Sequence, residues 1–218
     1  MFIGHYAVAL AVKKAAPKVS LGMLFLSTQF VDLLWPVFLL FGYEHVRIDP
    51  GNTAVTPLAF YDYPFTHSLL AAFIWSLILA LIYHVYKRDK ISSAIIGLCV
   101  FSHWILDFLT HRPDLPLAFG YDTYFGLGLW NSRIGTMAVE IVLFAVGIFL
   151  YLSSTSSKDK IGSYGFWTLI VLLFLIYVGN LFGPPPPDEF SIAVAGNASW
   201  LFVFWAFWVD RHRIYVNH

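Results

Sequence analysis

Six long apolar runs constrain the fold of this chain more than any other feature. They occupy residues 20–42, 66–86, 91–110, 135–152, 164–183 and 190–209. A helix crosses the hydrocarbon core of a bilayer with about 17–25 predominantly apolar residues, and every run has roughly this length. The chain is only 12% charged, whereas soluble domains carry about 25% charge. We therefore predict an all-α polytopic membrane protein with six transmembrane helices, folded as a single integral membrane domain over residues 1–218.

A shorter apolar run at residues 2–12 has about half the length needed to cross a bilayer. It predicts a short N-terminal half-helix in addition to the six spans. Lys13 and Lys14 follow its apolar core, whereas a secretory signal has its positive charge before that core. We therefore expect this segment to remain in the mature protein.

The distribution of basic residues predicts the orientation. An even number of spans places both termini on one side of the membrane. Of the 13 Lys and Arg residues, only Arg47, Arg112 and Arg133 lie in loops on the opposite side. The excess of Lys and Arg on cytoplasmic loops predicts cytoplasmic termini and extracytoplasmic loops at 43–65 and 111–134. We expect a bacterial or archaeal plasma membrane. The net charge of zero gives no basic surface for nucleic acid.

The run at 91–110 contains three side chains that can bind metal. His103, Asp107 and His111 are spaced at i, i+4 and i+8, which places them along one stripe of a helix. Polar and ionisable side chains inside a membrane are costly and usually face a site or a cavity. The stripe therefore predicts a functional site within the bilayer.

Depth estimates bring further groups to the same level. Counting from the cytoplasmic lysines at about 1.5 Å per residue, Asp32 and His103 lie about 20 Å deep and Asp107 about 25 Å deep. His67 and His111 lie about 30 Å deep, so these groups meet in the outer half of the bilayer, with His111 at the rim where its helix ends. His5 reaches only about 13 Å, so the short first helix must tilt or sit deep to join them.

Imidazole nitrogen and carboxylate oxygen are typical ligands of zinc and similar ions. The predicted ligands share this chemistry and number enough for one or two divalent ions; they are His5, Asp32, His67, His103 and Asp107. Such ions favour attack of water on a phosphoryl group, with Asp32 as the preferred group to accept the proton. His111 ends its helix before Arg112 and Pro113. It could take part in catalysis, orient a ligand or meet the interface.

Four motifs carry a resemblance to a known family. They are GHYAVA at 4–9, QFVDLLWP at 29–36, PFTHSLL at 64–70 and SHWILDFLTH at 102–111. In these motifs the chain resembles the membrane-bound metal-dependent hydrolases, whose order of ligands is similar to that of zinc-dependent phospholipase C. The resemblance implies metal ligation by the same five residues and hydrolysis as the activity. The chain departs from the family in having only Asp32 where a Pro-Asp-x-Asp cluster is common. It also has Tyr63, Pro64 and Phe65 where Arg-Gly precedes Thr-His.

The expected substrate is a membrane lipid or a lipid-linked molecule, because the two outer loops are rich in aromatic residues that suit an amphiphile. Two alternatives stay open. The cluster of Asp32, His103 and Asp107 would also serve a cation or proton transporter. A membrane scaffold without catalytic activity would use His103 and Asp107 only as a hydrogen-bonded pair between helices. The sequence carries no signal for an oligomeric state.

Other polar groups have open roles. Glu140 lies about 27 Å deep by helix rise and could be a metal ligand, an acceptor for a ligating histidine or the partner of Arg133. Arg47, Arg112 and Arg133 could hold phosphate on the outer face. They could equally anchor their loops at the lipid headgroups.

Overall fold

The computed structural model describes residues 1–216 and is mostly helical. The helices of spanning length are α5 (Leu69–Lys87), α6 (Lys90–Thr110), α7 (Arg133–Ser154), α8 (Lys160–Phe182) and the Glu189–Arg211 span, made of α9 (Glu189–Asn197) and α10 (Ser199–Arg211). The bent pair α2 (Leu21–Thr28) and α3 (Phe30–Leu40) passes the same test of length and hydropathy as a sixth. The prediction of an all-α integral membrane protein is confirmed.

Polar side chains fix where most of these helices begin. The residue before the helix accepts a hydrogen bond from a backbone N–H of the first turn, which satisfies a donor that has no partner within the helix. The caps of this kind are Ser20, Ser68, Asp89, Ser132, Asp159 and Asp188. They explain why apolar runs that merge into polar loops still start at defined residues.

The first span is broken at Gln29, not at Pro36. Helices α2 and α3 meet at an angle of 56°. The hydroxyls of Ser27 and Thr28 donate to the carbonyls one turn back, which competes with regular helix bonding and favours a bend. Pro36 stays inside α3 and packs closely on Gly196 of α9, where an added Cβ would lie 2.6 Å from its Cγ.

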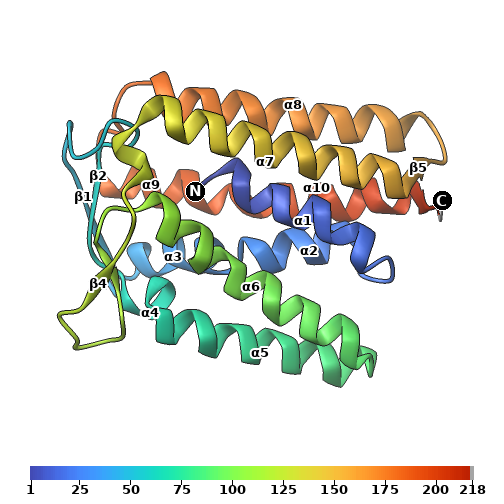
Figure 1. The fold of residues 1–218 in the computed structure, drawn as a ribbon, viewed down its shortest axis with the longest axis horizontal. Coiled ribbons are helices and arrows are strands. Elements are labelled where there is room, and N and C mark those ends of the chain that lie inside the picture. The colour runs from blue at the N-terminus through green and yellow to red at the C-terminus, as the bar shows by residue number, and fades with distance from the viewer. Residues whose placement is uncertain (217–218) are drawn as a thin grey trace.

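Helix α1 (Ile3–Ala15) lies inside the bundle (Figure 1). It packs along α7, and the contact is so close that a Cβ on Gly147 would lie 2.5 Å from the Ala7 carbonyl oxygen. The side chains of Ile3, Tyr6 and Leu10 are fully or almost fully buried. The short half-helix therefore sits deep, as His5 requires, and its first residues reach the centre of the molecule.

Short antiparallel strand pairs lie at the two ends of the bundle. At one end β1 (His45–Ile48) pairs with β2 (Leu58–Asp62), and β3 (Leu115–Pro116) pairs with β4 (Tyr124–Phe125). The one-turn helix α4 (Pro64–His67) follows β2, and the 3₁₀ turn η1 (Leu129–Asn131) precedes α7. At the opposite end β5 (Thr155–Ser157) pairs with β6 (Arg213–Tyr215) (Figure 1).

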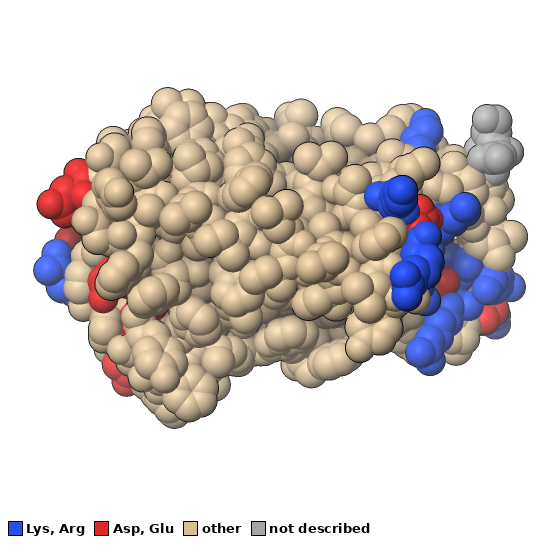
Figure 2. Space-filling view, turned by 90° about the horizontal axis from the view of Figure 1, so that it is seen from below, with Lys and Arg blue, Asp and Glu red and all other residues tan. Residues whose placement is uncertain are grey.

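The two ends of the molecule differ in the charge of their surfaces. Figure 2 shows Lys and Arg gathered at the end that carries β5 and β6, with a wide belt free of charged residues between the ends. Large apolar side chains are exposed on this belt, for example Phe73 and Leu77 of α5 and Phe149 of α7. A belt of this kind suits contact with lipid chains.

Candidate metal centre

Helices α3, α4 and α6 place four potential ligands around one point. His103 Nε2 lies 3.1 Å from Asp107 Oδ2 and 3.5 Å from Asp32 Oδ1. His67 Nε2 lies 3.2 Å from Asp32 Oδ1 and 3.9 Å from Asp107 Oδ2. Ligand atoms at the corners of a tetrahedron around zinc, each about 2.0 Å from the ion, lie about 3.3 Å apart. The distances from His103 Nε2 to both carboxylates and from His67 Nε2 to Asp32 are close to this spacing, whereas the distance from His67 Nε2 to Asp107 is longer.

Both histidines use Nδ1 for a neighbouring oxygen and turn Nε2 toward the carboxylates. His103 Nδ1 donates to the Thr28 carbonyl oxygen at 2.7 Å, and His67 Nδ1 lies 2.7 Å from the Thr66 hydroxyl oxygen. The proton of His103 is thus on Nδ1, and its buried Nε2 has no hydrogen-bond partner within residues 1–216. A nitrogen this close to two carboxylates must carry a proton or share a metal cation with them, since a bare lone pair there would be repulsive. These residues therefore fit a bound metal ion.

The break between α2 and α3 at Gln29 allows His103 to adopt this orientation. The end of α2 leaves the Thr28 carbonyl without a regular helical partner. That carbonyl then accepts the bond from His103, which comes from α6. A hydrogen bond to the second nitrogen of a ligating histidine fixes the ring and raises its basicity.

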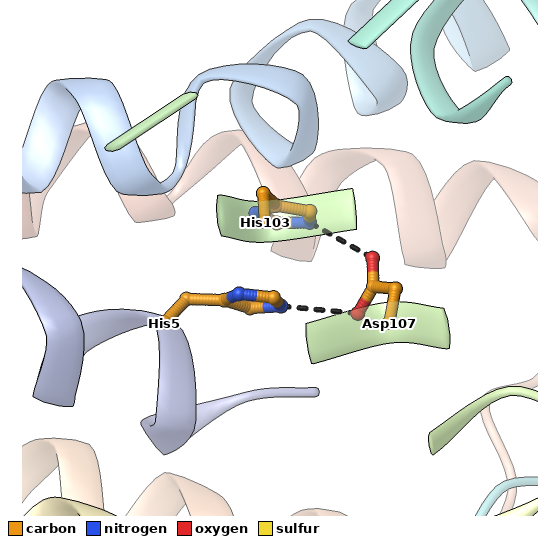
Figure 3. Close-up of side chains that lie close together, drawn as sticks. All are labelled: His5, His103 and Asp107. Carbon is orange, nitrogen blue, oxygen red and sulfur yellow. Dashed lines mark hydrogen bonds and ion pairs between the residues drawn. The ribbon is translucent and has the colours of Figure 1, made fainter. Parts of the chain in front are cut away.

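His5 contacts the same carboxylate from the other side. Its Nε2 lies 3.1 Å from Asp107 Oδ1, and its ring stacks on His103 with centroids 3.6 Å apart and an angle of 4° between the rings (Figure 3). The α-amino group of Met1 also lies 2.6 Å from Asp107 Oδ1. Two groups of potential ligands result, His5–His103–Asp107 and Asp32–His67–His103, and they share His103.

The centre is closed on most sides. The side chains of His5, His103 and Asp107 are at most 2% exposed and that of His67 is 6% exposed, whereas that of Asp32 is 33% exposed. Asp32 is therefore the most exposed of the five potential ligands.

His111 lies apart from these groups, in a second polar cluster. Its Nδ1 lies 2.9 Å from Asp114 Oδ1, which also accepts a bond from the Tyr63 hydroxyl at 3.1 Å. Burial lowers the pKa of His111 below its usual value. Tyr63 links the clusters, because its ring centroid lies 5.2 Å from that of His67 and 6.2 Å from that of His111.

Glu140 has a role that the sequence did not indicate. Its Oε2 accepts bonds from the backbone N–H groups of Phe2 and Gly4, at 3.0 and 3.2 Å. It lies in neither group of potential ligands, and Arg133 donates to the Ala54 carbonyl oxygen instead. Glu140 therefore holds the first turn of α1, the helix that presents His5.

The outer arginines contact their own loops. Arg112 Nε donates to Asp114 Oδ2 at 3.3 Å, and Arg47 lies 3.9 Å from Asp49. Together with the bond from Arg133 to Ala54, these contacts agree with loop anchoring.

Sequence reasoning missed four residues around the centre: Glu44, Tyr63, Thr66 and Asp114. Thr66 and Asp114 carried a weak signal, because they lie one and three positions from a predicted site histidine. Glu44 carried none, since the hairpin of β1 and β2 separates it from His67 in the sequence.

Comparisons with known protein families, with curated proteins and with solved structures found no match for this chain.

Proposed function

We propose that this chain is a metal-dependent hydrolase within the membrane, acting on a phosphoester of a lipid or lipid-linked substrate. One observation carries the proposal: His67 and His103 turn Nε2 toward Asp32 and Asp107 at distances of 3.1–3.9 Å, and Asp32, His67 and His103 form a group of potential metal ligands. The resemblance to the membrane-bound metal-dependent hydrolases points the same way.

A single ion is the arrangement that we favour. His103 belongs to both groups of potential ligands, but with Nδ1 bonded to Thr28 it offers one lone pair. His67, His103, Asp32 and Asp107 would hold this ion. His5 would then orient Asp107 through the oxygen that faces away from His103.

A zinc ion at this position would polarise a phosphoryl oxygen and make an attacking water more acidic. Asp32 is the proton acceptor that we propose, since it is the exposed carboxylate of the centre. The oxygen of the water would form a bond to phosphorus as the ester P–O bond breaks. The water proton would pass to Asp32, which would return it to the oxygen of the leaving alkoxide. His111, with Nδ1 on Asp114, has Nε2 left to accept a hydrogen bond or proton at the rim.

Two adjoining hollows support an amphiphilic substrate. One, of about 560 Å³, is lined by apolar side chains such as Leu70 and Phe73 of α5 and Phe101 of α6. The other, of about 210 Å³, is lined by Tyr63. Tyr121 lines both. A lipid chain would occupy the first hollow and its polar group the second, beside the tyrosine that contacts His67.

The basic end of the molecule supports cytoplasmic termini and an extracytoplasmic centre. Labelling tests this orientation: in a Cys99→Ala background, Gly51→Cys in the outer loop should react with an impermeant thiol reagent on intact cells. Reaction only after the cells are lysed would reverse the orientation.

A transporter is the second candidate. It requires a polar path from the centre to the basic end, but Ile96, Cys99 and Val100, on α6 toward that end, are buried and apolar. We therefore prefer the hydrolase. Ion flux into proteoliposomes that Asp32→Asn abolishes would reverse this preference.

The test of the proposed function has two measurements on purified protein. Elemental analysis should find one equivalent of transition metal, and lipid phosphoesters in nanodiscs should be hydrolysed. The double variant His103→Ala, Asp107→Ala should lose both properties. Wild-type protein without bound metal after supply of zinc, or undiminished metal in the double variant, would refute the proposal.

A further inference from the structure

Glu44 is a buried carboxylate near the candidate metal centre, but it belongs to neither group of potential ligands. It follows α3 and is 0% exposed. Its Oε1 accepts bonds from the backbone N–H groups of Phe65 and Thr66, at 2.7 and 2.8 Å, and its Oε2 accepts from the Thr66 hydroxyl at 2.7 Å. Three donors thus converge on one carboxylate at the start of α4.

The Thr66 hydroxyl links Glu44 to His67 by hydrogen bonds. A hydroxyl has one proton to donate, and Thr66 donates it to Glu44. Toward His67 Nδ1, 2.7 Å away, the same oxygen can only accept. A proton of His67 must therefore be on Nδ1, so Nε2, 3.2 Å from Asp32 Oδ1, is the nitrogen that a metal ion could bind in place of a proton.

We propose that Glu44 is a positioning residue that, through the Thr66 hydroxyl, holds His67 in the tautomer able to bind metal at Nε2. The proposal rests on the proposed metal centre, but it requires neither hydrolysis nor a lipid substrate. His103 needs no such relay, because its Nδ1 faces a carbonyl, which can only accept.

The charge state of Glu44 is essential to this role. In Glu44→Gln, the oxygen would stay on the two backbone N–H groups and the new NH₂ group would face Thr66. The hydroxyl would then accept from the amide and donate to His67 Nδ1. That reversal moves the ring proton to Nε2, where it blocks metal binding.

The test is a titration of metal-free protein with Co²⁺, followed by the visible absorption of the bound ion. Glu44→Gln and Thr66→Val should weaken binding by about 10–100-fold, the usual effect of losing an outer-shell partner. Thr66→Ser keeps the hydroxyl and should restore wild-type affinity. Glu189→Gln is the matched control, since Glu189 accepts the Val46 backbone N–H on the neighbouring strand.

The outcomes separate this proposal from its alternatives. Wild-type affinity for Co²⁺ in both Glu44→Gln and Thr66→Val would overturn the proposal that Glu44 positions His67. Weak binding in Glu44→Gln with unchanged binding in Thr66→Val would also overturn it, because Glu44 would then only cap α4. Wild-type protein that binds no Co²⁺ would instead refute the metal centre. Unfolding temperatures of the metal-free variants show whether each remains folded.

Discussion

Two buried polar clusters of this protein differ in whether their hydrogen bonds are complete. Around Arg213, every guanidinium nitrogen has an acceptor from Thr155, Ser157 or Gly162. The guanidinium also lies 5.1 Å from the ring centroids of Tyr151 and Phe166. The guanidinium supplies the cation of this cluster and is fully paired, and only the Tyr151 hydroxyl beside it lacks a hydrogen-bond partner within residues 1–216.

The cluster around His103 is the opposite case. Its two carboxylates, Asp32 and Asp107, have one formal cation, the α-amino group of Met1 on Asp107, and His103 Nε2 is buried without a hydrogen-bond partner in the described part of the chain. A buried polar group left unpaired costs about 1–3 kcal/mol, so such a cluster persists when something supplies the missing charge. A satisfied cluster indicates a structural role, and an unsatisfied one indicates a binding site.

Zinc should therefore stabilise the protein through the second cluster alone. Zinc at 100 times its dissociation constant should raise the free energy of unfolding by about 2.7 kcal/mol. The double variant His103→Ala, Asp107→Ala should show no rise, because both ligands on α6 are gone. Thermal unfolding with and without zinc measures the effect. An equal rise in the double variant would place the zinc site elsewhere and remove the contrast between the clusters.

Arg213→Met should lower stability without changing metal binding. The substitution leaves the acceptors of Thr155, Ser157 and Gly162 without their donor, at a cost of about 1–3 kcal/mol. Denaturant unfolding and a zinc titration check both parts. Arg211→Met is the control, since Arg211 is exposed and should change stability little. A large loss of zinc affinity in Arg213→Met would show that the clusters are coupled.

Glu140→Leu should affect the centre indirectly. Without Glu140 the backbone N–H groups of Phe2 and Gly4 lose their acceptor, and the turn that carries His5 should loosen. We expect zinc affinity to fall about 10-fold, at the low end for outer-shell changes. Hydrogen exchange at residues 2–5 should become faster, while Glu140→Gln, which keeps one acceptor oxygen, should show less of both effects. Unchanged exchange would mean that α7 packing alone holds α1.

The smallest predicted effect is a pH dependence at the Arg213 end. Hydrogen bonds from His212 and from the Gly162 backbone N–H lower the pKa of Asp159 below its usual 3.8. Because the pKa of Asp159 is lower in the folded protein, its ionised form stabilises the fold. This contribution to the free energy of unfolding is fully present above pH 3.8 and is lost as the pH falls through the folded pKa. Asp159→Asn should therefore unfold at a slightly lower temperature than wild type at pH 5, with a smaller difference at pH 3. A difference in unfolding temperature that does not change with pH would exclude the ion pair between Asp159 and His212 as its cause.

The sequence was sufficient for the spans, because the length of an apolar run and the spacing of residues along a helix are local properties. The predicted run at 91–110 agrees with α6, and the i, i+4 spacing of His103 and Asp107 places both on one face of that helix. Depth along the membrane also brought Asp32 and His67 to the level of this pair. Their roles as ligands stay predictions.

The tertiary structure decided what depends on groups far apart in the chain. The Thr28 carbonyl becomes available to His103 because the span breaks at Gln29, whereas Pro36 stays inside α3. His111 shares the stripe of His103 in the sequence, but it turns to Asp114 once its helix ends. Glu44 and Glu140 act through backbone N–H groups, which every residue except proline has. Sequence patterns record side chains, so acceptors of backbone bonds leave no signal until the chain has folded.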